Sequence, residues 1–90
     1  MPTKSDVQLH VLNFLHAITG ISPAGLSNNL DTALKDSPLS MDDPSLANLA
    51  GMLRGYIQNI DPAQTFLVQE ARTPDLTVQG LIDLVFKKVK

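Results

Sequence analysis

The residue with the clearest chemical potential is a serine at the start of a predicted helix. Ser45 lies in the segment Asp42-Asp43-Pro44-Ser45-Leu46, between a turn-rich stretch and a long apolar repeat. We expect Asp43 to be the N-cap and Pro44 the first helical residue, where the missing N–H of proline is no loss. Ser45 would then present its hydroxyl to solvent in the first helical turn. Unpaired N–H groups and the positive end of the helix dipole favour a phosphodiester at that position.

Other reactive residue types give no catalytic or metal site. His10 and His16 are six residues apart, which puts them on different faces of one helix, so we expect surface histidines. The adjacent carboxylates of Asp42 and Asp43 are typical of a helix cap and its solvated neighbour. The sequence has no cysteine, no glycine-rich phosphate loop, no G-x-S-x-G elbow and no H-E-x-x-H motif. We therefore expect a protein that is not an enzyme.

Composition predicts one small helical domain, residues 1–90. Hydrophobic residues make up 43% of the chain and aromatic residues only 4%, so the core must be built mainly from aliphatic side chains. The net charge of −2 has the wrong sign for binding nucleic acid. Met1-Pro2-Thr3-Lys4-Ser5 lacks the apolar run of a signal peptide, and no stretch is long enough to cross a bilayer. These features predict a cytoplasmic protein without a membrane partner.

The elements that must position Ser45 are four predicted helices. Apolar spacing and cap signals place the first three at about Ser5–Thr19, Asp43–Ile60 and Ala63–Ala71, and a fourth that Asp75 or Thr77 caps and that continues to Val89. The connection between the first two is long, and leucines at every fourth residue predict a short helix within it at Asn29–Lys35. We thus expect an all-α four-helix bundle with a long loop between helices 1 and 2 and a short third helix. Gly51 and Gly55 predict a close approach of another backbone to the second helix.

The order of these features resembles the acyl carrier protein family. Ser45-Leu46 is similar to the last two residues of the family's Asp-Ser-Leu motif at the start of its second helix. Thr77-Val78 is similar to the start of the family's last helix, and Thr19-Gly20-Ile21 to the end of its first. The resemblance extends in short pieces from about Val7 to Val89.

The resemblance implies a 4′-phosphopantetheine arm on Ser45, next to Leu46, that holds an acyl chain as a thioester. Its partners would be a phosphopantetheinyl transferase and acyl-transfer enzymes of a specialised lipid or secondary-metabolite pathway, and the carrier would be a monomer. Ser37 and Ser40 are further attachment candidates. Leu46, Leu49, Met52 and Leu53 would either line a channel for the chain or form plain core.

The sequence also departs from the family pattern, and the departures leave a second hypothesis open. Pro44 replaces the aspartate before the serine, and residues 47–54 contain one arginine and no acid, where the family presents an acidic helix to basic partners. A carrier of this kind would depend on apolar contact or on a reversed charge pattern. The alternative is an unmodified helical protein–protein interaction module that uses the small residues of 46–57 to dock a partner helix or to self-associate.

Overall fold

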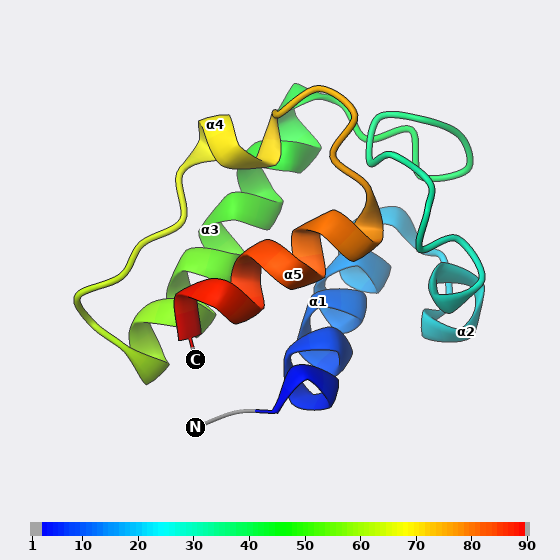
Figure 1. The fold of residues 1–90 in the computed structure, drawn as a ribbon. Helices are drawn as coiled ribbons and strands as arrows, with labels where there is room; N and C mark the ends of the chain where they lie inside the picture. Colours follow the sequence, from blue (N-terminus) through cyan, green and yellow to red (C-terminus); the bar gives the residue numbers. More distant parts are fainter. Residues whose placement is uncertain (1–2, 90) are drawn as a thin grey trace.

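Five α-helices form the secondary structure of residues 3–89, the part of the chain that the computed structural model describes (Figure 1). The all-α class is confirmed, but four helices were expected. Residues 1, 2 and 90 lie outside the described part, and the expectation for the first two residues of the chain lies outside it with them. The helices are α1 (Lys4–Thr19), α2 (Pro23–Ser27), α3 (Asp43–Ile60), α4 (Val68–Ala71) and α5 (Val78–Val89).

Helix α1 begins slightly earlier than predicted because Thr3, rather than Ser5 or Asp6, is its N-cap. The Asp6 N–H donates to Thr3 Oγ1 at 3.2 Å, and the Thr3 N–H donates to Asp6 Oδ2 at 3.4 Å, which completes a capping box. The helix ends at Gly20, as predicted. Gly20 has φ 78°, a left-handed conformation that glycine adopts without steric cost, and its N–H donates to the His16 carbonyl at 2.9 Å.

The prediction of a helix at Asn29–Lys35 is wrong, because the helix of this connection is α2. Ser22 caps it by accepting from the Gly25 N–H at 3.1 Å, and Pro23 is its first residue, so the local serine–proline signal determined the start. Residues 29–35 form turns instead.

The connection between α1 and α3 is part of the core. Its buried side chains are Leu26, Leu34, Leu39 and Met41. The Leu34 N–H donates to the Leu76 carbonyl at 2.9 Å, and the Met41 N–H donates to the Leu34 carbonyl at 2.9 Å. An isolated β-bridge joins Ala33 to Thr77 beside these bonds. These bonds therefore hold the end of the connection, next to Asp42, against the start of α5.

Helix α3 is capped by Asp42, one residue before the predicted cap. Asp42 has the extended conformation of an N-cap, and its carboxylate accepts from the Ser45 N–H at 3.0 Å. Asp43 and Pro44 are the first two helical residues. A Cβ at Gly51 or Gly55 would meet no atom within 4 Å, so no other segment of residues 3–89 approaches α3 closely at these glycines.

Helices α4 and α5 complete the bundle. Helix α4 is only four residues long, shorter than the predicted Ala63–Ala71, because Asp61 holds a turn in place by accepting from the Ala63 N–H at 3.1 Å. For α5 the cap is Thr77 and not Asp75, since Thr77 Oγ1 accepts from the Gly80 N–H at 3.0 Å. Lys88 ties the two helices together, with its Nζ 3.1 Å from Glu70 Oε2.

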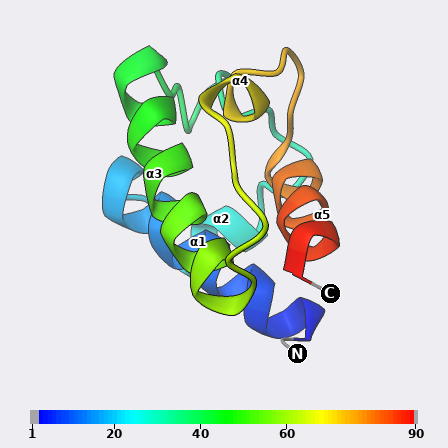
Figure 2. The same cartoon turned by 90° about the vertical axis from the view of Figure 1, so that its left-hand side faces the viewer.

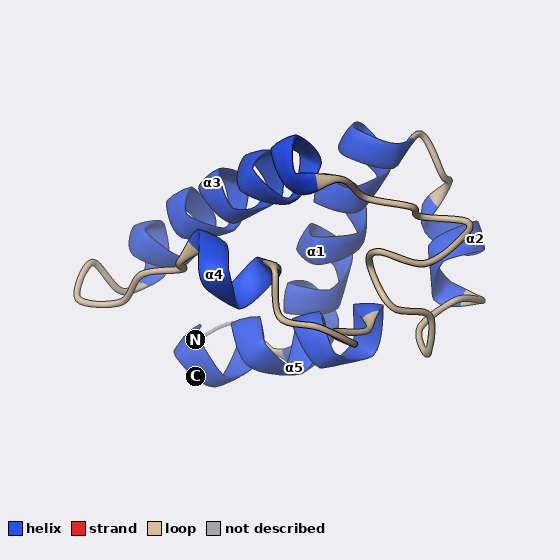
Figure 3. Cartoon of the chain, turned by 90° about the horizontal axis from the view of Figure 1, so that it is seen from above, coloured by secondary structure: helices blue, strands red, loops and turns tan. Residues whose placement is uncertain are grey.

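The core lies between α1, α3 and α5. Helix α1 contacts both of the other long helices and α2 (Figure 3), while α4 packs on α3 and its approach segment passes between α3 and α5 (Figure 2). Every buried side chain in residues 3–89 is hydrophobic. The fold of this part thus depends on aliphatic packing, as the composition predicted.

A leucine-to-alanine pair tests how much the connection contributes. Leu34→Ala should lower the free energy of unfolding by about 2–5 kcal/mol, because Leu34 is 1% exposed and its removal leaves a cavity. Leu9→Ala is the control, since Leu9 is 54% exposed and its loss should change stability by less than about 0.5 kcal/mol. Urea denaturation measures both. Equal, small effects would mean that the connection does not belong to the core.

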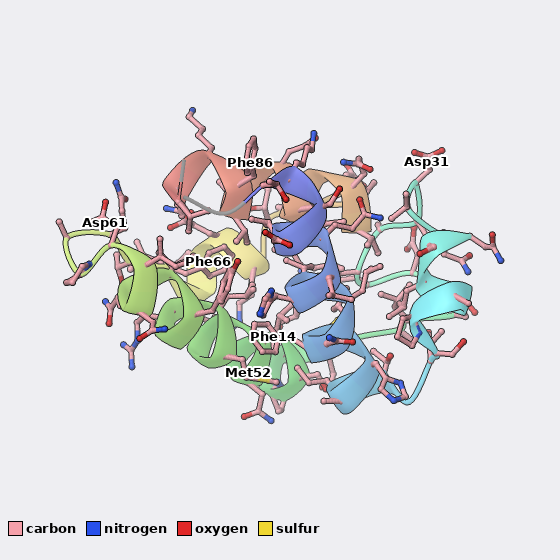
Figure 4. All side chains as sticks on the ribbon, turned by 90° about the horizontal axis from the view of Figure 1, so that it is seen from below. Phe14, Asp31, Met52, Asp61, Phe66 and Phe86 are labelled. Carbon is pink, nitrogen blue, oxygen red and sulfur yellow. The ribbon has the colours of Figure 1, made fainter. Side chains whose placement is uncertain are left out.

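An aromatic cluster joins α1 to α3 and contains an unsatisfied hydroxyl. His10 stacks on Tyr56 with ring centroids 4.5 Å apart, and Phe14, which lies between α1 and α3 (Figure 4), meets Tyr56 edge-on at 6.1 Å. The Tyr56 hydroxyl is buried and makes no hydrogen bond within residues 3–89. Burial, and then the charge of Asp6, raises the pKa of Tyr56 above its ordinary value, so the hydroxyl is neutral at physiological pH.

Tyr56→Phe should therefore raise the free energy of unfolding, by about 1 kcal/mol. The substitution keeps the ring contacts and removes a buried polar group that has lost its water without gaining a partner. Urea denaturation of the two proteins measures the difference. A loss of stability would show that the hydroxyl is hydrogen-bonded in solution.

Candidate functional site

Ser45 is the third residue of α3 and is half-buried. Its N–H donates to Asp42 Oδ1, and the Leu46 N–H donates to the Asp42 carbonyl at 2.9 Å. Pro44 has no N–H to offer. Fewer N–H groups than expected are therefore available to an anion beside the Ser45 hydroxyl, because Asp42 engages the N–H of Ser45 itself.

The electrostatics of this helix start are dominated by carboxylates. Hydrogen bonding from the Ser45 side chain, and then from its backbone N–H, holds the pKa of the Asp42 carboxyl below its ordinary value of 3.8. Asp43 lies beside it and makes a loose ion pair with Arg72, whose Nε is 3.7 Å from Asp43 Oδ1. Ser45 is thus held through its backbone N–H by an ionised carboxylate, and one arginine pairs with the neighbouring Asp43.

The other residues predicted to surround Ser45 belong to the core. Leu46, Leu49 and Leu53 have no exposed surface, and Met52 is half-buried. The apolar stripe is therefore filled by packing and does not line an open channel. The buried side chain of Leu46 anchors the first turn of α3 in the core.

A hollow of about 180 Å³ lies between α3 and the segment that leads into α4. Ala47, Ala50 and Gly51 line its α3 side, Phe66 and Val68 line the other, and Arg54 lies at one end. Arg54 follows Ser45 by nine residues, or about two and a half helical turns. Ser45 and the hollow therefore lie on nearly opposite sides of α3.

Sequence reasoning identified the small residues of this hollow but missed its second wall. Ala50 and Gly51 follow Ala47 by three and four residues, which already places them on one helix face. Phe66 and Val68 come from a separate segment, and no local pattern shows that they pack across from α3. The one sequence feature at this place is the apolar run Phe66-Leu67-Val68, which does not say what it packs against, and in the structure Phe66 is 2% exposed.

The histidines and the other serines do not add to the site. His10 and His16 are exposed, and each uses its Nδ1 in a contact with a backbone carbonyl, that of Asp6 and that of Ile21. Ser37 and Ser40 are exposed in the loop. Residues 3–89 contain no group of three or more His, Asp or Glu side chains that could hold a metal ion, and none of their helices is long and apolar enough to cross a membrane.

Comparison of the chain with protein-family models, with curated proteins and with solved structures gave no match. The function is therefore argued from the geometry of Ser45 and of the hollow.

The Asp42 cap predicts a specific pH dependence of stability. Because the pKa of Asp42 is lowered in the folded protein, its contribution is complete above the ordinary value of 3.8 and is lost as the pH falls through the lower folded value. Asp42→Asn keeps a capping oxygen but does not titrate. We expect the acid decline in the urea midpoint to be shallower in Asp42→Asn than in the wild type, and parallel curves would contradict the Asp42–Ser45 contact.

Proposed function

We propose that the protein is a carrier that holds an acyl chain on a 4′-phosphopantetheine arm attached to Ser45. The observation that carries this proposal is the setting of Ser45. It lies in the first turn of the longest helix, its backbone N–H is held by Asp42, and the preceding connection is fixed to the core through Leu34. A fixed helix start presents a modified serine in one place to successive enzymes.

The arrangement of helices supports the same proposal. If α2 is taken as part of the long connection, then α1, α3, α4 and α5 follow the order of a four-helix carrier bundle in which the third helix is short. The modified residue then lies at the junction of the long connection with the second helix of that bundle.

The only reacting group that this chain must supply is the hydroxyl of Ser45. The Ser45 oxygen forms an ester bond with the phosphorus of the phosphopantetheine group of coenzyme A, the bond from that phosphorus to the rest of the coenzyme breaks, and the hydroxyl proton leaves. A phosphopantetheinyl transferase catalyses this step, and acyl-transfer enzymes then act on the arm. Asp42 holds the backbone N–H of Ser45, and Arg72 is the cation that pairs with Asp43 at the same helix start.

Intact-protein mass spectrometry tests the attachment site. After incubation with coenzyme A and a broad-specificity phosphopantetheinyl transferase, the wild type should gain the mass of one phosphopantetheine. Ser45→Ala should gain nothing, because it lacks the accepting oxygen.

A Ser37→Ala/Ser40→Ala double variant is the matched control and should be modified like the wild type. Modification that survives Ser45→Ala would move the site into the loop. The absence of any mass gain with several transferases would end the carrier proposal.

A second candidate function, an unmodified docking module, is favoured by the hollow on α3. Gly51 and Gly55 are exposed, nothing packs over them within residues 3–89, and Arg54 is the only charged residue of α3 after Asp43. A helix face with small side chains and little charge can approach a partner closely with little loss of hydration.

A further inference from the structure

We propose that the hollow between α3 and residues 66–68 is a docking site for a segment of another protein that inserts one apolar side chain and places a carboxylate against Arg54. This inference rests on the docking function proposed above and does not require modification of Ser45. It adds the chemistry of the partner.

The shape of the hollow determines the size of the inserted group. Its floor is made by Ala47, Ala50 and Gly51, whose short side chains leave space beside the helix, and Phe66 supplies an aromatic wall. A cavity of about 150 Å³ in a protein interior accommodates benzene. The 180 Å³ of this hollow is therefore enough for a single leucine, methionine or phenylalanine side chain.

The same dimensions favour a protein partner over a small ligand. Sites for small molecules usually have about 300–1,000 Å³ and enclose most of the ligand surface. This hollow is smaller, and its lining comes from one side of α3 and one short segment. An occupant held elsewhere by its own chain, such as a side chain on a partner helix, does not need to be enclosed.

The position of the hollow argues against occupation by a group on Ser45. Ser45 comes nine residues before Arg54 and so lies on nearly the opposite side of α3. The attachment point of the arm is therefore not part of the hollow.

The charge of Arg54 favours an acidic partner. The ion pairs of residues 3–89 use Lys4, Arg72 and Lys88, and none uses Arg54. Arg54 is exposed, and no hydrogen bond of its side chain occurs in the same part of the chain. An arginine buried by a partner must gain an acceptor, because an unpaired charge removed from water is costly. A partner helix with a carboxylate one turn from the inserted apolar side chain can fill the hollow and give Arg54 an acceptor.

The test uses helical peptides as probes and the unmodified full chain. The first peptide presents one leucine and a glutamate four residues later, and three variants replace the glutamate with glutamine, the glutamate with lysine, or the leucine with alanine. Amide chemical shifts of the ¹⁵N-labelled protein report the site and the affinity. We expect shifts at Ala47, Ala50, Gly51 and Val68. Affinity should be highest for the glutamate peptide, about threefold lower for glutamine and lowest for lysine, and the alanine peptide should not bind.

Two protein variants separate the shape of the hollow from its charge. Gly51→Leu should abolish the shifts by filling the hollow, whereas Gly55→Leu, at the other exposed glycine of α3 and outside the hollow, should leave them unchanged. Both positions have open space for a side chain, so both variants should fold. Arg54→Glu should reverse the ranking, with the lysine peptide now binding best.

The outcomes distinguish this inference from the functions proposed above. Shifts at the hollow with equal affinity for the glutamate and lysine peptides would overturn the acidic partner and keep the docking function. An absence of shifts at the hollow, or equal binding by Gly51→Leu, would overturn both. Neither result bears on the mass gain at Ser45, which tests the carrier proposal separately.

Discussion

The backbone pairing between the long connection and the start of α5 is the constraint on which the rest of the molecule depends. The Val78 N–H donates to the Thr32 carbonyl at 3.1 Å, and the Gln79 N–H donates to the Leu30 carbonyl at 2.8 Å. These are the first N–H groups of α5, which have no partner within their own helix. The connection therefore caps α5 with its own backbone. The same bonds give the carbonyl groups of the connection their partners, which an irregular segment needs in order to lie against the core.

This pairing also determines where α3 begins. Leu34 is bonded on one side to Leu76 and on the other to Met41, so the residue before Asp42 has a fixed place in the fold. Asp42 then caps α3 and engages the Ser45 N–H. The place of Ser45 in the fold thus follows in part from contacts made far away in the sequence. Local helix-start signals alone placed the cap one residue too late, at Asp43.

Two flanks of α3 have different chemistry because different segments of the same chain lie against them. One flank carries Tyr56, which meets His10 and Phe14 of α1. The other faces the segment before α4, where small residues and Arg54 leave the hollow open. Ser45 lies away from the hollow, at the helix end. A carrier arm and a docked partner could therefore occupy α3 at the same time without competing for the same atoms.

The sequence by itself determined the all-α class, the position of the three long helices to within about two residues and the stop at Gly20, because apolar spacing and glycine or aspartate caps are local signals. The burial of Leu46, Leu49 and Leu53 followed from the same spacing. Only the tertiary structure decided the cap at Asp42, the extent of α4, the turns at residues 29–35 and the second wall of the hollow. The turns and the second wall depend on hydrogen bonds or packing between segments distant in the chain, as in the pairing of Leu34 with Leu76, and no local pattern encodes such a contact. The Asp42 cap and the turn at Asp61 are made by local hydrogen bonds, and at each place the sequence also allowed a helix that starts at a different residue.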